Sequence, residues 1–477
     1  MSILRNKVKR NSIKKILVPL ALIALMMTMP MFEGANAQTA GSSYGLIKII
    51  ALPKAPASTD IAYVDPTLHL YMVSDKTNLG IDIINTTSNT YITTVTGFVG
   101  ANGVTIAPDL NQAWVGDNNA TSTASTVKVV SLTNYTIIGN ITITNPTTGT
   151  GTIGRSDELS YDQKDHVILV ANDAAIPPFV TFINATSKQI IAQIPYDGIA
   201  ANNATNGLEQ SIWNPTNDLF YQAVPSTVNN TGGEIDVLNP NSTSIVQVYP
   251  LPAGSEPHGL ALNVALQKLC VGASQIGAPN GTPIFTVIMN ATNGQILNQV
   301  MGIGGTDEVW SNAADSRFYV CGKITLDGTN NGSALGAIAV IDATSGIYLE
   351  NIILPGFQRY LSMRTVAADS SNNDIYILLS TAGVGVVTDL LGNYTSTIGA
   401  TGPAGPQGAT GATGATGPAG PKGATGATGT PGPIGSSSTP AVPEFGSAAL
   451  ISIAAAIIVV TLCAIAVTAR TRKTLRK

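Results

Sequence analysis

The sequence predicts an all-β protein: a seven-bladed β-propeller, followed by a collagen-like Gly-X-Y tract and a single C-terminal transmembrane helix. Three observations predict this organisation. A pattern of four short strands recurs about every 50 residues over residues 44–398, as in propeller repeats. Glycine then occupies every third position from 399 to 435, as a collagen helix requires. Residues 447–469 contain no charged side chain, and about 20 such residues span a bilayer as a helix.

The N-terminal segment, residues 1–37, has the features of a secretory signal peptide. Basic residues precede the apolar run 16–32, and Ala35-Asn36-Ala37 provides a small-residue cleavage site. We therefore expect export and removal of this segment. An uncleaved membrane anchor is the alternative, and Pro19 and Pro30 argue against it because they interrupt the apolar run.

Residues 38–398 form the predicted propeller. In each unit a first apolar strand ends in Asp or Asn, as in "DIAYVDP" and "HGLALNV", and three more strands follow between Asn, Gly and Thr turns. Seven first strands predict seven blades. The opening segment 45–53, "GLIKIIALP", resembles the fourth strand of the sixth unit. We expect it to be the outer strand of blade seven, which closes the ring and hides a sheet edge.

Residues 71–109 resemble the YVTN family of β-propeller repeats, which occurs in archaeal and bacterial surface proteins. They contain a Tyr-x-Val-Ser opening, an Ile-Asp strand and a closing Gly-x-x-x-Ala-Pro-Asp. The resemblance covers nearly all of residues 44–398. It implies a propeller fold and a surface location, but a fold by itself does not identify a function.

Equivalent positions of the seven first strands line the channel of a propeller and therefore form a ring. The position five residues before the end of each first strand is polar in every unit: Asp60, Asn102, Asp157, Glu209, His258, Asp307 and Arg364. The neighbouring Glu158 and Glu308 add carboxylates. Clustered oxygen ligands suit Ca²⁺ or Mg²⁺, so one hypothesis is a cation or polar-ligand site at one mouth of the channel. The other is a water-filled channel lined by solvated side chains, in which Arg364 neutralises a carboxylate.

Enzymatic chemistry has little support in the sequence. His69 and His166 fall near second strands, and only His258 lies on the ring, where Glu209 or Asp307 is an available acid–base partner. The sequence has no Gly-rich phosphate loop, no His-x-x-x-His pair and no haem motif. We expect no catalysis and no cofactor. A hydrolase or lyase at His258, or Ca²⁺ or Mg²⁺ held by the ring, is the alternative.

The cysteines and tryptophans are expected to be structural. Cys270 and Cys321 fall in second strands of adjacent blades, whose sheets lie about 10 Å apart, so no disulfide is expected between them. The remaining cysteine, Cys463, falls in the predicted membrane helix. All three tryptophans are predicted to lie in the core between blades: Trp114, Trp213 and Trp310.

The charge balance of the exported part is acidic. The chain has 24 basic and 28 acidic residues. The signal contains six of the basic and one of the acidic residues, and the tail contains five basic residues and no acidic one, so the exported part has 13 basic and 27 acidic residues. The net charge of −14 argues against a nucleic-acid partner, because a nucleic-acid groove needs a positive field.

Twelve positions satisfy Asn-x-Ser/Thr without proline and are candidates for N-glycosylation. They are Asn85, Asn119, Asn134, Asn140, Asn184, Asn203, Asn229, Asn241, Asn280, Asn290, Asn331 and Asn393.

The glycine tract, residues 399–435, predicts a stalk that projects the propeller from the membrane. Only glycine fits the axis of a collagen triple helix, so the strict period favours a homotrimer. A monomeric extended spacer is the alternative, because the tract is short and rich in Gly-Ala-Thr triplets.

Residues 436–446 link the stalk to the membrane helix and contain Pro443, Glu444, Phe445 and Gly446. With the helix 447–469 and the basic tail 470–477, this tetrapeptide resembles the PEFG-type C-terminal sorting signal of archaeal surface proteins. The resemblance implies recognition by an archaeosortase-like membrane enzyme and loss of the helix. A permanent membrane anchor is the alternative. The basic tail is expected in the cytoplasm and the rest outside the cell.

Together these features predict an exported protein at the outer face of the cytoplasmic membrane, anchored there or processed by a sorting enzyme. We expect it to display the propeller for adhesion or cell-envelope interaction, with envelope or extracellular proteins or glycans as partners. The alternative is an exported metal-dependent ligand-binding protein or enzyme that uses the polar ring of the channel.

Overall fold

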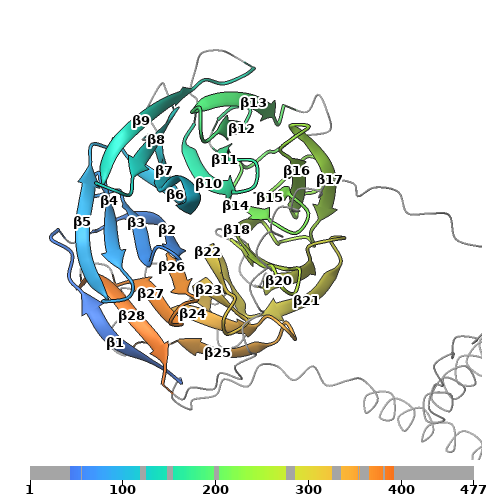
Figure 1. Ribbon diagram of the computed structural model, residues 1–477. Helices are drawn as coiled ribbons and strands as arrows, with labels where there is room; N and C mark the ends of the chain where they lie inside the picture. The colour runs from blue at the N-terminus through green and yellow to red at the C-terminus, as the bar shows by residue number, and fades with distance from the viewer. Residues whose placement is uncertain are drawn as a thin grey trace, which may run out of the picture. The chain divides into compact units, whose positions relative to one another are not determined.

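A computed structural model describes the propeller (Figure 1). The described residues are 43–54, 56–118, 125–147, 154–173, 175–197, 203–274, 285–324, 335–352, 354, 365–379 and 382–390. Within them, 28 strands form seven four-stranded antiparallel sheets arranged as a ring around a central channel. The predicted all-β, seven-bladed propeller is therefore confirmed.

The strands occupy four positions from the channel outward. The innermost strands are β2 (Thr59–Asp65), β6 (Ala101–Ala107), β10 (Ser156–Asp162), β14 (Ser211–Asn214), β18 (Pro257–Asn263), β22 (Ile303–Asn312) and β26 (Val366–Asp369). The second strands are β3 (Leu70–Asp75), β7 (Gln112–Asp117), β11 (Val167–Asn172), β15 (Leu219–Val224), β19 (Lys268–Ala273), β23 (Arg317–Ile324) and β27 (Asp374–Leu378).

The third and outermost strands complete each blade. The third strands are β4 (Gly80–Asn85), β8 (Ser125–Ser131), β12 (Phe179–Asn184), β16 (Glu234–Asn239), β20 (Phe285–Asn290), β24 (Leu335–Asp342) and β28 (Val384–Asp389). The outermost strands are β5 (Thr90–Thr96), β9 (Thr136–Ile143), β13 (Gln189–Pro195), β17 (Ser244–Pro250), β21 (Ile296–Met301), β25 (Tyr348–Ile352) and β1 (Tyr44–Ile50). A 3₁₀ turn, η1 (Pro108–Leu110), joins β6 to β7.

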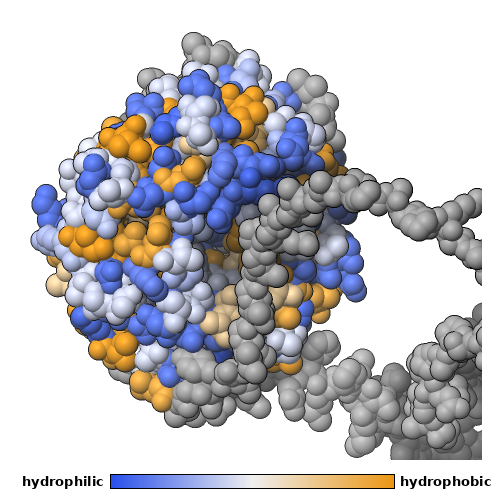
Figure 2. All heavy atoms as spheres, in the orientation of Figure 1, coloured by the Kyte–Doolittle hydropathy of each residue, from blue (hydrophilic) through white to orange (hydrophobic). Residues whose placement is uncertain are grey.

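The core consists of seven hydrophobic clusters, one between each pair of neighbouring blades within the described residues. Each sheet is thus covered on both faces, which explains why second strands such as β11 are apolar without alternation and fully buried. The outer strands alternate instead, as in β9, because one edge and part of one face contact solvent. On the face shown in Figure 2, hydrophobic residues occur in separate groups among hydrophilic ones.

The acidic or amide residue that ends most first strands makes a local turn. The Asp65 carboxylate accepts hydrogen bonds from the backbone N–H groups of Thr67 and Leu68, both at 2.8 Å. Asp162, Asn214, Asn263, Asn312 and Asp369 make equivalent bonds. Side chains of this type favour turns because they satisfy backbone donors locally. His69 and His166 lie in these turns with positive φ values of 53° and 54°, rather than on a strand surface.

The ring is closed by the first strand, as the sequence predicts. β1 pairs antiparallel with β28, from Tyr44 opposite Asp389 to Ile50 opposite Val384. The Arg317 guanidinium of blade six donates a hydrogen bond to the Asp389 carboxylate at 3.1 Å and contacts the Tyr44 ring. Blade seven therefore combines the two ends of the described chain, and a buried ion pair connects it to blade six.

The predicted signal peptide, stalk, sorting motif, membrane helix and tail lie outside the described residues, as does Cys463. None of the described residues forms a helix long and apolar enough to span a bilayer.

Candidate functional site

The predicted ring residues lie at one end of the channel, where the inner strands begin. Asp60, Asn102, Asp157, His258 and Asp307 fall in β2, β6, β10, β18 and β22. Glu209 lies two residues before β14, and Arg364 lies outside the described residues. The six described residues separate into groups that interact with different partners, and they do not form one continuous ring.

Glu209, His258 and Asp307 form the first group, contributed by blades four, five and six. His258 Nδ1 lies 3.4 Å from Glu209 Oε1 and 3.6 Å from Asp307 Oδ1. One ligand atom from each side chain lies within 4.8 Å of the others, a spacing that suits a metal ion. The three side chains are 16 to 25% exposed, so solvent and solutes reach them from the mouth of the channel.

Burial and neighbouring charge raise the pKa values of both Glu209 and His258. Burial raises the pKa of Glu209 to about 7, although the imidazole of His258 opposes this shift. Burial lowers the pKa of His258, but the carboxylates of Glu209 and Asp307 outweigh it and hold the pKa above its ordinary value. Glu209 therefore titrates close to neutral pH, the range in which a general acid or base operates.

Asp60 and Asp157 belong to a second group, which is neutralised by two cations. Lys76 forms an ion pair with Asp60, and Arg155 Nη2 lies 2.7 Å from carboxylate oxygens of both Asp157 and Asp173. The sequence pattern did not indicate these cations. Strand pairing could have indicated part of this group. In an antiparallel pair the end of the second strand lies beside the start of the first, and this places Lys76 and Asp173 next to the ring residues.

Asn102 has a structural role. Its side-chain Nδ2 donates to the backbone oxygens of Ser156 at 3.1 Å and Asn118 at 3.2 Å. It therefore connects blade two to blade three through its amide nitrogen.

The neighbouring glutamates lie deeper in the channel. Glu308 is fully buried, and its Oε2 accepts hydrogen bonds from the backbone N–H groups of Val366 at 3.0 Å and Ala62 at 3.4 Å. It thus links blade six to blades seven and one. Burial raises the pKa of both Glu158 and Glu308 well above the ordinary value, and nearby carboxylates add to the shift.

A β-bulge lies at this level in five inner strands. The strand register shifts between Thr59 and Ala62, and equivalent shifts occur in β6, β10, β18 and β22. A bulge places consecutive side chains off the regular alternation. This allows Asp157 to pair with Arg155 at the mouth while the next residue, Glu158, lines a cavity below.

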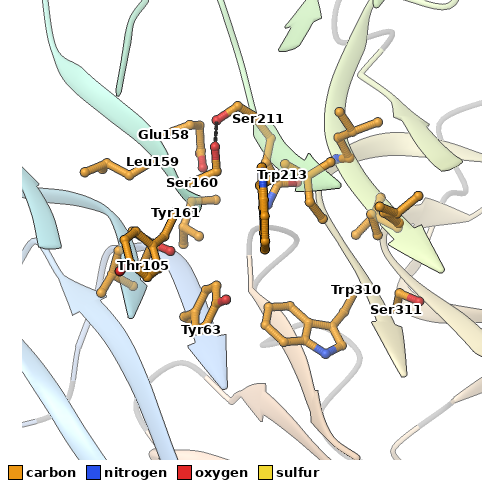
Figure 3. Close-up of a pocket in the computed structure, with 18 of the residues that line it drawn as sticks. Tyr63, Thr105, Glu158, Leu159, Ser160, Tyr161, Ser211, Trp213, Trp310 and Ser311 are labelled. Carbon is orange, nitrogen blue, oxygen red and sulfur yellow. Dashed lines mark hydrogen bonds between the residues drawn. The ribbon is translucent and has the colours of Figure 1, made fainter. Parts of the chain in front are cut away.

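That cavity is enclosed by six inner strands and measures about 210 Å³. Figure 3 shows Tyr63, Trp213 and Trp310 pointing into it, with Glu158, Ser160 and Ser211 along another side. The predicted place of the tryptophans is thus only partly correct. Trp114 is fully buried between blades two and three. Trp213 and Trp310 each pack one part of the indole against an inter-blade cluster, and another part of the indole lines the channel cavity.

The two cysteines of the propeller, Cys270 and Cys321, are buried and form no disulfide with each other, as expected. The candidate glycosylation sites differ in exposure. Asn134, Asn140, Asn229 and Asn241 are exposed. Asn85, Asn184 and Asn290 are half-buried, and their side-chain oxygens accept turn hydrogen bonds. Asn203 is also half-buried, and the remaining four lie outside the described residues.

The propeller is expected to be more stable at mildly acidic pH than at neutral pH. Burial raises the pKa of Asp82 to about 6 and those of Glu209 and Asp236 to about 7, from about 4 in the unfolded chain. The folded state therefore binds more protons between about pH 4 and 7, and the free energy of unfolding falls as pH rises through this window.

Thermal unfolding at constant ionic strength measures this dependence. The midpoint should be a few degrees higher at pH 5 than at pH 7.5. Glu209→Gln should reduce the difference, because it removes one of the titrating groups. A midpoint that rises with pH over this window would contradict the assignment of these groups.

The sequence matches no protein-family model, and no curated protein is significantly similar to it. The observed seven-bladed propeller is consistent with the resemblance to YVTN repeats.

Proposed function

We propose that this chain is an exported cell-surface protein that displays its propeller for adhesion or cell-envelope interaction. In this proposal a collagen-like stalk carries the propeller, and a C-terminal helix anchors the chain until an archaeosortase-like enzyme removes it. The observation that supports it best is the pairing of β1 with β28, because both ends of the propeller lie in the same sheet.

This closure suits a domain that is held by one stalk. The glycine tract begins at residue 399, shortly after β28 ends at Asp389. A force along the stalk thus enters at β28, which is hydrogen-bonded to β27 on one side and to β1 on the other. The buried pair of Arg317 and Asp389 adds a link to blade six. The C-terminal strand of the described propeller, β28, is therefore not an edge strand of its sheet.

The proposed partners are proteins or glycans of the envelope or the extracellular space. The exported part has a net charge of −14, which disfavours nucleic acid and other polyanions. Exposed sequons, such as Asn140 on β9 and Asn241 beside β17, are accessible for glycans. The Gly-X-Y tract supports a homotrimer, in which three propellers bind a surface together more tightly than one.

Cell-surface labelling tests the location. Antibodies to the propeller should label intact cells as strongly as permeabilised cells. Mass spectrometry of the mature protein should find a C-terminus close to residues 443–446. Labelling only after permeabilisation would contradict the proposal, and an intact C-terminal helix in mature protein would identify a permanent anchor.

The sorting motif is tested by replacing Glu444 and Phe445 with alanine. Because a sorting enzyme reads these side chains, we expect the variant to keep its C-terminal helix and to remain in the membrane fraction. Replacing Ser437 and Ser438 with alanine, in the same linker, is the matched control and should leave processing unchanged.

A second candidate function, a metal-dependent ligand binder, hydrolase or lyase, is favoured by the grouping of Glu209, His258 and Asp307. Two carboxylates and one imidazole suit a divalent cation. Metal analysis of the purified protein tests it: bound metal that is lost in both Glu209→Ala and His258→Ala would support this function, and metal-free protein would not.

A further inference from the structure

The cavity in the channel has an aromatic wall that is fixed in place. Tyr63 of β2 and Trp310 of β22 meet edge to face, with ring centroids 5.4 Å apart. Trp310 Nε1 donates a hydrogen bond to the backbone oxygen of Ala368 at 2.9 Å, which orients the ring. Trp213 of β14 completes the wall (Figure 3), and its buried Nε1 has no hydrogen-bond partner among the described residues. The wall therefore presents large π surfaces to the cavity.

The opposite wall contains one carboxyl group, that of Glu158. The hydroxyls of Ser160 and Ser211 bond to each other at 2.7 Å, and Gln210 Oε1 accepts from the backbone N–H of Leu260 at 2.6 Å. Glu158 is 6% exposed and, among the described residues that line this cavity, it is the only one with a carboxyl side chain. It is thus the lining group that can supply a full charge to a ligand.

Carboxyl groups lie around Glu158. Its described neighbours at the mouth and in the channel include Asp60, Asp157, Glu209 and Glu308, all of which raise the pKa of Glu158. Lys76 and Arg155 are paired with carboxylates at the mouth, and no Lys or Arg is among the described residues that line the cavity. A cationic ligand therefore meets a carboxyl group and no like charge on the described cavity wall.

We propose that this cavity binds a small organic ammonium ion, with its charged nitrogen against Tyr63, Trp213 and Trp310 and beside Glu158. The negative face of an aromatic ring attracts a cation, and aromatic residues that surround a cavity recognise substituted ammonium groups in this way. The ligand's carbon atoms contact apolar residues of the same cavity, such as Val104 and Leu260. Binding of the cation favours ionisation of Glu158 and releases its proton to solvent.

The size and composition of the cavity argue for this class. The volume of about 210 Å³ is smaller than the roughly 300–1,000 Å³ of drug-sized ligand sites, so the ligand has few heavy atoms. A bare metal ion needs several oxygen ligands, which the aromatic wall does not offer. An anion would find no Lys or Arg among the described residues that line the cavity. The proposal does not depend on where the protein is located or on a metal at Glu209, His258 and Asp307.

Calorimetry on the full chain, purified in detergent, tests the proposal with choline as the probe. The control ligand is 3,3-dimethylbutan-1-ol, which has nearly the same shape but no charge. We expect choline to bind and to quench or shift tryptophan fluorescence, and the alcohol to bind at least about tenfold more weakly. Equal binding of the two ligands, or no choline binding at millimolar concentration, would overturn the proposal.

Two variants assign the binding to this cavity. Glu158→Gln keeps the shape but removes the charge, and should weaken choline binding by about tenfold or more while leaving the alcohol unaffected. Trp213→Leu should weaken choline binding by a similar factor. If Glu158→Gln does not fold, the Trp213→Leu variant alone tests whether choline binds in this cavity. Glu350→Gln, in the outermost strand β25, removes the same charge outside the channel and should change nothing.

The remaining outcomes are also decisive. If Glu350→Gln weakens choline binding as much as Glu158→Gln does, choline responds to the overall charge of the protein, and the assignment of its binding site to this cavity is wrong. If glucose binds and choline does not, and Trp213→Leu abolishes glucose binding, the cavity is a saccharide site and the ammonium proposal fails.

Discussion

Replacing Gly103 by alanine is expected to lower the free energy of unfolding of the propeller by about 3 kcal/mol or to prevent folding. Gly103 lies in β6, where blade two approaches the backbone of blade three. A Cβ atom there would lie 2.0 Å from the backbone oxygen of Asp157 and 2.9 Å from the Cα of Glu158. These are backbone atoms of an inner strand, so relief requires that two blades move apart.

Urea unfolding followed by far-UV circular dichroism measures this effect. Gly139→Ala, in the outer strand β9, is the matched control, because its Cβ would meet only side-chain atoms of Lys188 and Val129 at 3.1 Å. The control should change stability by less than about 1 kcal/mol. Comparable losses in the two variants would show that the close approach of blades two and three does not limit packing.

Removing residues 43–50 is expected to cost most of the stability of the propeller, which for a domain is about 5–15 kcal/mol. The deletion takes away β1 and with it the backbone bonds to β28. It also removes the buried side chains of Tyr44 and Ile50 from the clusters on either side of blade seven. The exposed edge of β28 would then promote aggregation.

Two comparisons make the deletion informative. The double substitution of Ile47 and Ile49 by threonine keeps the pairing and alters only exposed side chains, so it should change stability by about 0.5 kcal/mol or less. A synthetic peptide of residues 43–53, added to the deleted protein, should restore cooperative unfolding by adding the missing strand. A deleted protein that unfolds like the intact one would show that closure through β1 is dispensable.

Local patterns were enough to predict the number and order of the strands. The strand Val167–Asn172 is apolar up to Ala171 and buried throughout, because its blade is covered on both faces. The Asp or Asn that ends a first strand marks a turn because its side chain bonds to the backbone two or three residues later, as at Asp65. The likeness of residues 45–53 to a fourth strand predicted ring closure correctly, because a terminal strand of this kind needs an open edge to pair with.

The sequence predicted which residues belong to the candidate site, but not which of them pair with cations. Counting along the first strands identified Glu209, His258 and Asp307, which the structure brings together. It did not predict that Asp60 and Asp157 would be paired with Lys76 and Arg155. Those partners depend on strand pairing, which brings distant residues to the same end of a sheet.

The sequence by itself determined seven repeats, four strands in each, and an acidic end of the channel, because strand patterns and turn residues act over a few neighbours. Only the tertiary structure decided which carboxylates are paired, that Trp213 and Trp310 face the channel, and that Glu158 lies beneath the ring and lines a cavity. For Glu158 the physical reason is the β-bulge between Ser156 and Leu159 of β10. A bulge breaks the two-residue alternation, so side-chain direction there cannot be counted from sequence and is set by the contact between blades.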